Sequence, residues 1–265
     1  MGPVKVLCIG GSDSGGGAGI QADLKAVSAC GCYGMSVITA VTAQNTQGVQ
    51  SIHPVPRKFI LAQLDSVLSD IGADAVKTGM LLTAGAVESV VKKVKEYRLE
   101  KLIVDPVMVA KGGHSLMQDK SRNALIKKLL PLAFVVTPNI PEAEALAQMK
   151  IGSVAAMKKA AVIIHRLGTK NVLIKGGHLP GRKCSGALDI LFDGDHYYEF
   201  SSPWIATKNT HGTGCTYASA LAAGIAKGES IVDAAWQAKI TVTAAIENAV
   251  SLGKGHGSVN VFGKK

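Results

Sequence analysis

The feature that most constrains this chain is the alternation of short, apolar, β-rich runs with longer amphipathic stretches. Between the runs, Arg57–Ile71 and Thr83–Tyr97 place apolar side chains at helical spacing. Repeated β-α-β units predict a mostly parallel sheet with helices on both faces. Aliphatic residues must build the core, because aromatics make up only 5% of the chain, and this favours buried parallel strands. The candidate strands are Val4–Ile9, Ser36–Ala43, Ala75–Thr78, Leu102–Val104, Phe134–Val136 and Val172–Ile174.

The pattern changes near the end of the sequence. Leu188–Phe192 and His196–Phe200 flank Asp193-Gly194, which predicts a hairpin with a tight turn and therefore an antiparallel edge on the sheet. An Ala-rich helix is expected over Cys215–Lys227. No break in composition marks a boundary, so a single α/β domain over residues 1–265 is predicted. Helix N-caps are predicted at Thr83, Asp119, Ser153 and Ser230.

Charge and cysteine content narrow the class of protein. The net charge of +10 would suit nucleic acid or anionic, phosphorylated small molecules. The lysines are scattered over separate helix faces and stacking aromatics are scarce, so no nucleic-acid partner is expected. No apolar run reaches about 18 residues and no signal sequence is visible, so we expect no membrane partner. Without a CxxC pair, free thiols in a reducing cytoplasm are expected for Cys8, Cys30, Cys32, Cys184 and Cys215.

The strongest candidate for chemistry is a glycine-containing run that leads into the Ala-rich helix. Parallel α/β sheets bind ligands beyond the carboxyl ends of their strands, where this run is expected. Glycines at a helix start leave N–H groups free, and the helix dipole adds a positive field, so an anion is stabilised there. A bare glycine N-cap is the alternative interpretation, but it leaves the flanking threonines and lysine unexplained. The run comprises Lys208, His211, Gly212, Thr213, Gly214 and Cys215.

Two earlier segments could contact a ligand. The glycine-rich segment Gly10–Gly19 would let backbone N–H groups approach a ligand, although a flexible turn is the alternative. It matches a dinucleotide fingerprint only loosely, because Gln44 stands where an acidic residue would be needed. In the segment Thr42–Gly48, the Gln44 amide offers both a donor and an acceptor to the edge of a heterocycle. A solvated loop is the alternative for this second segment.

Three further strand ends carry charged residues. Asp105 ends a buried strand, where a carboxylate needs a partner or a metal. The glycine-rich stretch Met108–Met117 that follows it could be a mobile flap carrying Lys111. Glu142 follows the predicted cap Asn139 by three residues, which a capping box explains, although it could also hold a hydrated Mg²⁺. Lys175, beside two glycines, suits a phosphate, with a surface lysine as the alternative.

Taken together, these segments resemble the bacterial hydroxymethylpyrimidine/phosphomethylpyrimidine kinases, which belong to the ribokinase-like superfamily. The resemblance runs from about Val4 to Gly257. It implies a three-layer α/β/α sandwich, a homodimer, and two successive transfers from ATP with Mg²⁺ in one site. The motifs that carry it are Ala43-Gln44-Asn45-Thr46, Asp105-Pro106-Val107-Met108, Asn139-x-x-Glu142, Lys175-Gly176-Gly177-His178 and Lys208-Asn209-Thr210-His211-Gly212-Thr213-Gly214-Cys215.

The resemblance also implies residue roles. Gln44 would hydrogen-bond the pyrimidine, in a pocket shaped by Gly11, Asp23, Thr42, Met80 and Val107. Mg²⁺ and phosphate would be organised by Asp105, Asn139 and Glu142. The nucleotide would contact Lys175, Lys208, His211, Gly212, Thr213 and Gly214. The catalytic group would be Lys175, Gly212, Gly214 and Cys215.

Cys215 stands where sugar kinases of this superfamily carry an aspartate base. A thiol with a pKa of ~8.5 is a poor substitute unless the helix N-terminus lowers that pKa. The second acceptor is an anionic phosphate oxygen that needs no base, and phosphoryl transfer relies mainly on positioning and charge stabilisation. The hypothesis is therefore that the anion site contributes more than base catalysis.

Two alternatives remain open. A pyridoxal kinase of the same branch would act on a similar hydroxymethyl heterocycle, and an aldehyde could add to an accessible Cys215 thiolate. The Met108–Met117 stretch contains no cysteine, which modestly favours the pyrimidine. A nucleotide-binding regulatory protein without turnover is the alternative from another class, and it leaves Asp105, Glu142 and Lys175 unexplained.

Overall fold

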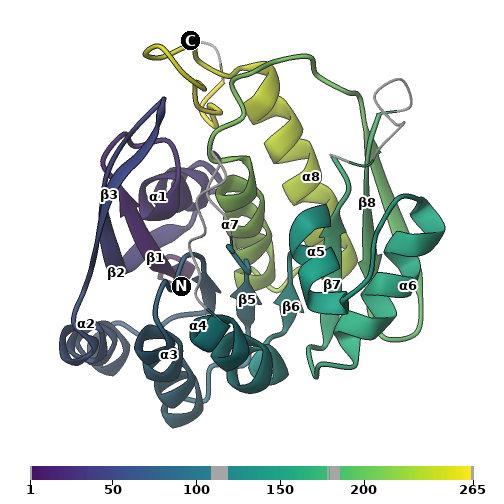
Figure 1. Ribbon diagram of the computed structural model, residues 1–265. Coiled ribbons are helices and arrows are strands. Elements are labelled where there is room, and N and C mark those ends of the chain that lie inside the picture. The colour runs from purple at the N-terminus through teal and green to yellow at the C-terminus, as the bar shows by residue number, and fades with distance from the viewer. Residues whose placement is uncertain (1, 109–118, 178, 180–185, 264–265) are drawn as a thin grey trace.

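One sheet organises the part of the chain that the computed structural model describes, which is residues 2–108, 119–177, 179 and 186–263 (Figure 1). Its nine described strands run in the order β3-β2-β1-β4-β5-β6-β7-β8-β9. The six central strands, which are β2, β1, β4, β5, β6 and β7, are parallel to one another. Strand β3 at one edge and strands β8 and β9 at the other pair antiparallel. The bounds are β1 Lys5–Asp13, β2 Tyr33–Asn45, β3 Gly48–Pro54, β4 Ala75–Thr78, β5 Leu102–Val104, β6 Val135–Val136, β7 Asn171–Lys175, β8 Ala187–Phe192 and β9 Tyr197–Ser202.

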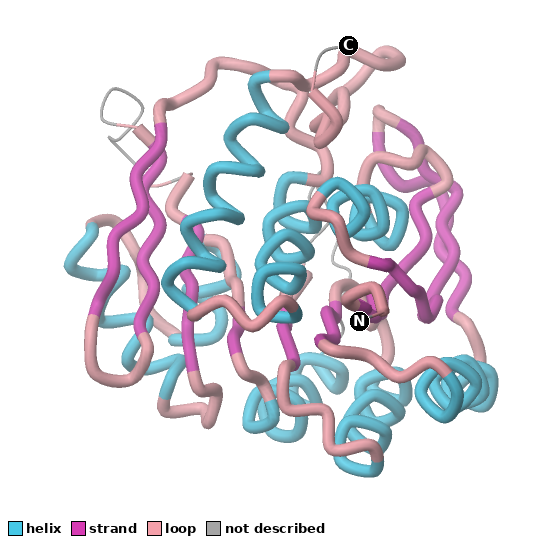
Figure 2. The backbone as a smooth tube through the Cα atoms, turned by 180° about the vertical axis from the view of Figure 1, so that it is seen from behind, coloured by secondary structure: helices cyan, strands magenta, loops and turns pink. Residues whose placement is uncertain are grey.

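Helices cover both faces of this sheet, as Figures 1 and 2 show from opposite sides. Helices α1, α7 and α8 pack on one face, and α2 to α6 pack on the other. The predicted three-layer α/β/α architecture is confirmed. The bounds are α1 Gly19–Ala29, α2 Arg57–Asp70, α3 Ala84–Glu96, α4 Asp119–Ala124, a π turn η1 Leu125–Leu129, a 3₁₀ turn η2 Leu130–Leu132, α5 Ile140–Ala147, α6 Val154–His165, α7 Thr213–Ala226 and α8 Ile231–Glu247.

Strand β1 shows why the sheet is buried on both sides. Leu7 and Ile9 enter the core beneath α2 and α3, whereas Val6 and Cys8 enter the core beneath α1 and α7. Successive side chains of a strand point to opposite faces, so a wholly apolar run satisfies both cores. Helix α7 complements this face with small residues, and its buried alanines bring the helix close to the strands. The start of α7 is thereby fixed against the ends of the parallel strands.

The predicted helix caps are largely confirmed. The hydroxyl oxygens of Thr83, Ser153 and Ser230 each accept a hydrogen bond at 3.1 Å from the backbone N–H three residues on. Asn139 and Glu142 form the complete capping box at the start of α5. Asp119 is the first described residue of α4 and pairs with Arg122.

The structure corrects three boundaries. Residues 10–13 continue β1 after a register shift, because they pair with β2, so the glycine-rich segment becomes a turn only from Ser14. Gln44 lies on β2 and not in a loop, because β2 continues to Asn45 and turns directly into β3. This second antiparallel edge was not predicted, since the polar residues of β3 hide a strand pattern.

The third correction concerns the hairpin between β8 and β9. Phe192 pairs with Tyr197, so four residues separate the strands and the tight Asp193-Gly194 turn was wrong. The Asp193 carboxylate explains the wider turn, because its Oδ1 accepts hydrogen bonds from the N–H groups of Asp195 and His196 at 2.9 and 2.7 Å.

Some sequence expectations fall partly outside the description. Residues 109–118 contain Lys111 and nearly all of the expected flap, and Cys184 and His178 are also undescribed. Cys8, Cys30, Cys32 and Cys215 are free thiols. Among the described helices, none is both long enough and apolar enough to cross a bilayer.

Candidate active site

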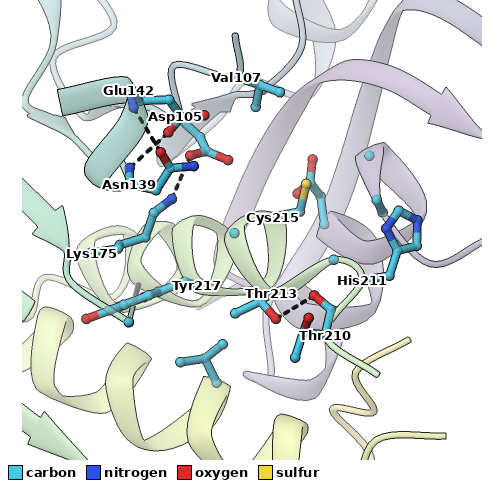
Figure 3. A pocket seen from close by; sticks show the side chains of 18 of the residues that line it. Asp105, Val107, Asn139, Glu142, Lys175, Thr210, His211, Thr213, Cys215 and Tyr217 are labelled. Carbon is cyan, nitrogen blue, oxygen red and sulfur yellow. Dashed lines mark hydrogen bonds and ion pairs between the residues drawn. The ribbon is translucent and has the colours of Figure 1, made fainter. Parts of the chain in front are cut away.

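A cavity of about 900 Å³ opens at the carboxyl ends of the parallel strands (Figure 3). Lys208 is the one predicted site residue absent from its described lining; this residue is exposed, and its carbonyl accepts from the Thr210 N–H at 3.1 Å. The fold brings the other predicted residues together. They are Gly11, Asp23, Thr42, Gln44, Met80, Asp105, Val107, Asn139, Glu142, Lys175, His211, Gly212, Thr213, Gly214 and Cys215.

The start of α7 forms an anion cradle, made of Gly212, Thr213, Gly214 and Cys215. Gly212 caps the helix with a φ of +83°, a conformation that favours glycine. The Thr213 hydroxyl donates to the Thr210 carbonyl at 2.8 Å and closes the turn. Within the described residues, the N–H groups of Gly214 and Cys215 have no backbone partner. These donors and the helix dipole together favour an anion at this point.

A buried ion pair lies against the cradle. Lys175 Nζ is 2.9 Å from Asp105 Oδ1, and the Thr137 hydroxyl is 3.2 Å from the same oxygen. Burial alone would raise the pKa of Asp105, but the charges of Lys175 and Lys77 hold that pKa below its usual range. Asp105 is therefore ionised. A Cβ atom on Gly214 would be 3.5 Å from Lys175 Nζ, so the lysine and the cradle can contact one anion.

Glu142 lies at the same mouth of the sheet (Figure 3). Its Oε2 accepts from the Asn139 N–H at 2.9 Å, and Asn139 Oδ1 accepts from the Glu142 N–H at 2.9 Å. Burial raises the pKa of Glu142 to about 7; nearby Asp105 raises it too, and Lys175 opposes the shift. A carboxyl group that is buried beside a second carboxylate prefers its protonated form, and a bound cation would favour the ionised form instead.

The donor set fits one kind of metal. In the described residues, no group of three His, Cys, Asp or Glu side chains could enclose an ion. Mg²⁺ needs no such cage, because it keeps several waters and binds through one or two carboxylates together with phosphate oxygens. Asp105 and Glu142 provide such carboxylates.

Cys215 is the last residue of the cradle and lies in the first turn of α7. Burial raises the pKa of its thiol to about 11, although the Lys77 charge and the Gly19 N–H oppose the shift. The helix N-terminus therefore does not produce a thiolate here, and at neutral pH this group is a protonated thiol.

Lys77, which sequence reasoning missed, lies behind Cys215. Its Nζ is 2.7 Å from Asp23 Oδ1, and both side chains are almost completely buried. Ser219 donates to the same Asp23 oxygen at 2.9 Å, whereas Asp23 Oδ2 is buried without a partner in the described chain. Lys77 stands inside an apolar strand, and this was the available signal, because a buried lysine requires an acidic partner.

A polar cluster occupies the opposite end of the cavity. His211 Nε2 is 2.9 Å from Asp13 Oδ2 and 3.2 Å from the Gln44 side-chain amide. That amide is also 3.1 Å from the Thr42 hydroxyl. His211, assigned to the nucleotide by resemblance, thus lies beside the predicted substrate residue Gln44. Asp13 was not singled out, because the glycines around it dominated the interpretation.

An apolar wall completes the lining beyond the cradle. It consists of Trp204, Ile205, Val242 and Ile246, none of which was singled out from the sequence. Trp204 follows β9, and the two aliphatic residues Val242 and Ile246 project from α8. Apolar side chains on a helix are ordinary core residues in a sequence, so no local signal distinguishes them.

The fold and these groups define a phosphotransferase of the ribokinase-like class, because an anion cradle, a lysine and two carboxylates line one cavity together with a polar cluster and an apolar wall. The sequence profile of the phosphomethylpyrimidine kinase family matches residues 13–260. The chain belongs to this family.

Individual relatives agree with this assignment. The chain is 49% identical to a hydroxymethylpyrimidine/phosphomethylpyrimidine kinase of Bacillus subtilis, over 98% of this chain and 96% of that protein. It is 54% identical to the thiamine biosynthesis bifunctional protein ThiED of Geobacter sulfurreducens, over 96% of this chain, and spans about half of that protein (51%). Among solved structures, an ADP complex of Bacillus subtilis pyridoxal kinase superposes with a TM-score of 0.91 at 40% identity, covering 97% of both chains.

Proposed function

We propose that the protein transfers phosphate from ATP to 4-amino-5-hydroxymethyl-2-methylpyrimidine and then to its monophosphate, giving the diphosphate for thiamine biosynthesis. The observation that carries the proposal is the continuity of the cavity. Gln44, the apolar wall, Lys175, Asp105 and the cradle all line this one cavity, and Lys175 lies against both Asp105 and the cradle. A hydroxymethyl group on a heterocycle held by Gln44 would then face the anion cradle.

Nucleotide binding uses the cradle side of the cavity. The adenine packs against the apolar wall, and Lys175 and the N–H groups of the cradle bind the phosphates. Asp105 and Glu142 would hold Mg²⁺, which would supply neutralisation of the charge on the transferred phosphoryl group. The negative charges of Asp105 and of the bound phosphate would keep Lys175 protonated.

Pyrimidine binding uses Gln44 and its neighbours. The amide contacts the nitrogen-bearing edge of the ring, since it offers a donor and an acceptor. Met80 lies over the backbone of Gly11 and supplies an apolar surface for the ring, together with Val107. The Asp23 oxygen without a partner accepts a hydrogen bond from a polar group of the ligand.

Chemistry in this site relies on charge stabilisation. A thiol whose pKa is raised to about 11 stays protonated at neutral pH, so Cys215 is a poor general base. The cradle and Lys175 instead stabilise the charge on the equatorial oxygens as the phosphoryl group moves. The monophosphate brings an ionised oxygen as acceptor and requires no proton removal.

The variant Cys215→Ser tests this division of labour. We expect the second transfer to keep its rate within about 10-fold, because it needs positioning and no base. The first transfer should lose more, since it alone releases a hydroxyl proton. Each step is measured separately, from pyrimidine or from its monophosphate as the starting substrate. A large and equal loss in both steps would contradict the hypothesis.

Product mass tests the function itself. The protein is incubated with ATP, Mg²⁺ and either the hydroxymethylpyrimidine or pyridoxal, and products are read by mass spectrometry. Mono- and diphosphate pyrimidine products are expected. Phosphorylation of pyridoxal alone would support the pyridoxal kinase alternative, which the likeness to the Bacillus subtilis pyridoxal kinase motivates. ATP binding without turnover of either acceptor would support a regulatory protein.

We also propose a cytoplasmic homodimer. The reduced thiols support the compartment, and the resemblance to the pyrimidine kinases supports the dimer. Light scattering coupled to size exclusion measures the mass directly, and a monomer at micromolar concentration would refute the second point.

A further inference from the structure

We propose that Asp13 and His211 are positioning residues that fix the direction of the Gln44 amide, and so decide which heterocycle edge the site accepts. The heterocycle itself rests on the proposed function. The inference begins from four side chains in one hydrogen-bonded row: Asp13, His211, Gln44 and Thr42.

Asp13 is an acceptor and nothing else. Its carboxylate receives the backbone N–H groups of Gly15, Gly17 and Ala18 at 2.8, 3.1 and 2.8 Å. The Asp13 side chain is only 3% exposed. Although burial acts against it, these N–H groups and His211 keep the pKa of Asp13 below its usual range. An ionised carboxylate can only accept hydrogen bonds.

His211 must therefore donate from Nε2. The ring nitrogen lies 2.9 Å from Asp13 Oδ2, and a lone pair there would face a negative oxygen. His211 is anchored through its backbone, because its main-chain N–H donates to the Gly257 carbonyl and its carbonyl accepts from the Val259 N–H, both at 3.1 Å. Its Cδ2 edge also lies against Gly17. In this position the Nε2 atom faces the Asp13 carboxylate.

This donor fixes the Gln44 amide. A single Nε2–H that points between Asp13 and Gln44 needs an acceptor at the 3.2 Å amide contact. The structure places Gln44 Nε2 beside His211 and Gln44 Oε1 beside the Thr42 hydroxyl. That orientation sets two nitrogen donors against each other, and it gives the single Thr42 proton two acceptors, Gln44 Oε1 and the Ser12 carbonyl. The reversed amide, with Oε1 beside His211, removes both conflicts. In the reversed orientation the amide nitrogen would donate to Thr42 Oγ1, and the Thr42 hydroxyl keeps its hydrogen bond to the Ser12 carbonyl at 3.0 Å. Every donor in the row meets an acceptor.

The remaining capacity of Gln44 defines its ligand. One N–H and one lone pair of the amide are left for the cavity, with their order along the amide set by His211. The complementary edge carries a ring nitrogen acceptor beside an exocyclic amino donor. A heterocycle with the two groups in the reverse order, or with two acceptors, leaves a buried polar atom unpaired. Selectivity against such heterocycles thus originates at Asp13, two residues beyond the residue that contacts the ligand.

Kinetics of two substitutions at one position test this inference. His211→Leu removes the donor, and we expect KM for the pyrimidine to rise about 10- to 100-fold, with KM for ATP changed less than about 3-fold. His211→Gln places an amide nitrogen near the Nε2 position, so it should recover most of the loss. His53→Leu is the matched control, because His53 is an exposed histidine on β3 and does not line the main cavity.

A double-mutant cycle separates positioning from general disruption. In a Gln44→Ala background, His211→Leu should raise KM by less than about 3-fold, since the group on which it acts is gone. Equal penalties in both backgrounds, or equal KM values for the leucine and glutamine variants, would overturn the proposal.

Long-range ¹H–¹⁵N correlation spectra give a readout that needs no turnover. The His211 ring, assigned by its loss in His211→Gln, should carry a proton on Nε2. An unprotonated Nε2 at neutral pH would overturn the relay. If the spectra agree and the wild-type protein phosphorylates no pyrimidine, the proposed function fails while the relay stands.

Discussion

Replacing Gly212 with alanine is expected to lower kcat/KM by about 10³-fold or more, because two cradle N–H donors shift together and each such donor is worth about 10²–10³ in kcat. At a φ of +83°, a Cβ atom would fall well inside contact distance of the Gly17 carbonyl oxygen. That oxygen belongs to the turn after β1, so the start of α7 must move away from it. Steady-state kinetics with ATP and pyrimidine measure the loss.

A matched control lies at the other end of the same helix. Gly228 also has a positive φ, +88°, but no heavy atom lies within 4 Å of a Cβ built there. Gly228→Ala should cost only about 1 kcal/mol of stability for the left-handed backbone, with kcat/KM unchanged. If Gly212→Ala kept more than about a tenth of the activity, the cradle would not be the main source of charge stabilisation.

Replacing Lys77 with methionine is expected to destabilise the fold by about 3–5 kcal/mol, the usual cost of leaving one member of a buried ion pair uncompensated. The side chains of Lys77 and Asp23 are almost completely buried, and one Asp23 oxygen already has no partner among the described residues. Urea unfolding followed by circular dichroism measures the change.

The pH dependence of this variant has a definite sign. Burial raises the pKa of Asp23, and Lys77 is the main charge that opposes the shift. Without Lys77 the folded carboxyl should bind its proton more tightly than the unfolded one. The stability deficit is then smaller at mildly acidic pH and grows as pH rises above the unfolded pKa.

Two further substitutions bound this second prediction. Lys77→Met with Asp23→Leu removes both charges and should recover most of the stability, since an apolar pair of similar volume fits the core. Lys128→Met removes an exposed partner of Glu88 and should change stability by less than about 1 kcal/mol. A deficit for Lys77→Met no larger than that of Lys128→Met would show that the buried pair is energetically unimportant.

Most of the sheet could be predicted from the sequence, because the central strands of the sheet are buried on both faces. Such strands read as continuous apolar runs, and β4, β5 and β7 were located within a residue or two. Strand β3 was missed because an edge strand faces solvent, and residues such as Gln50, Ser51 and His53 have no apolar alternation. The extension of β1 through glycines was missed because pairing, and not local preference, holds it extended.

Site prediction succeeded where a residue breaks its local pattern. Asp105 and Lys175 follow buried strands directly, and Gly212 precedes a helix, so their positions alone suggested ligands. Lys208 seemed equally suitable, but it is exposed and does not line the cavity. His211 contacts Asp13 across 198 residues of sequence, and no local pattern encodes that contact.

The C-terminal segment has a consequence for the order in which the protein is made. His256 donates from its N–H to the Thr46 carbonyl at 2.8 Å, and Gly257 accepts from the His211 N–H at 3.1 Å. Residues 255–258 thus join the β2–β3 turn to the cradle, and the contact from Gly255 to Thr46 spans 209 residues. On the ribosome, the sheet and its helices can form before this segment emerges. The site is therefore completed only after residues 255–258 have been made, so a nascent chain can form the sheet before it can bind ligand.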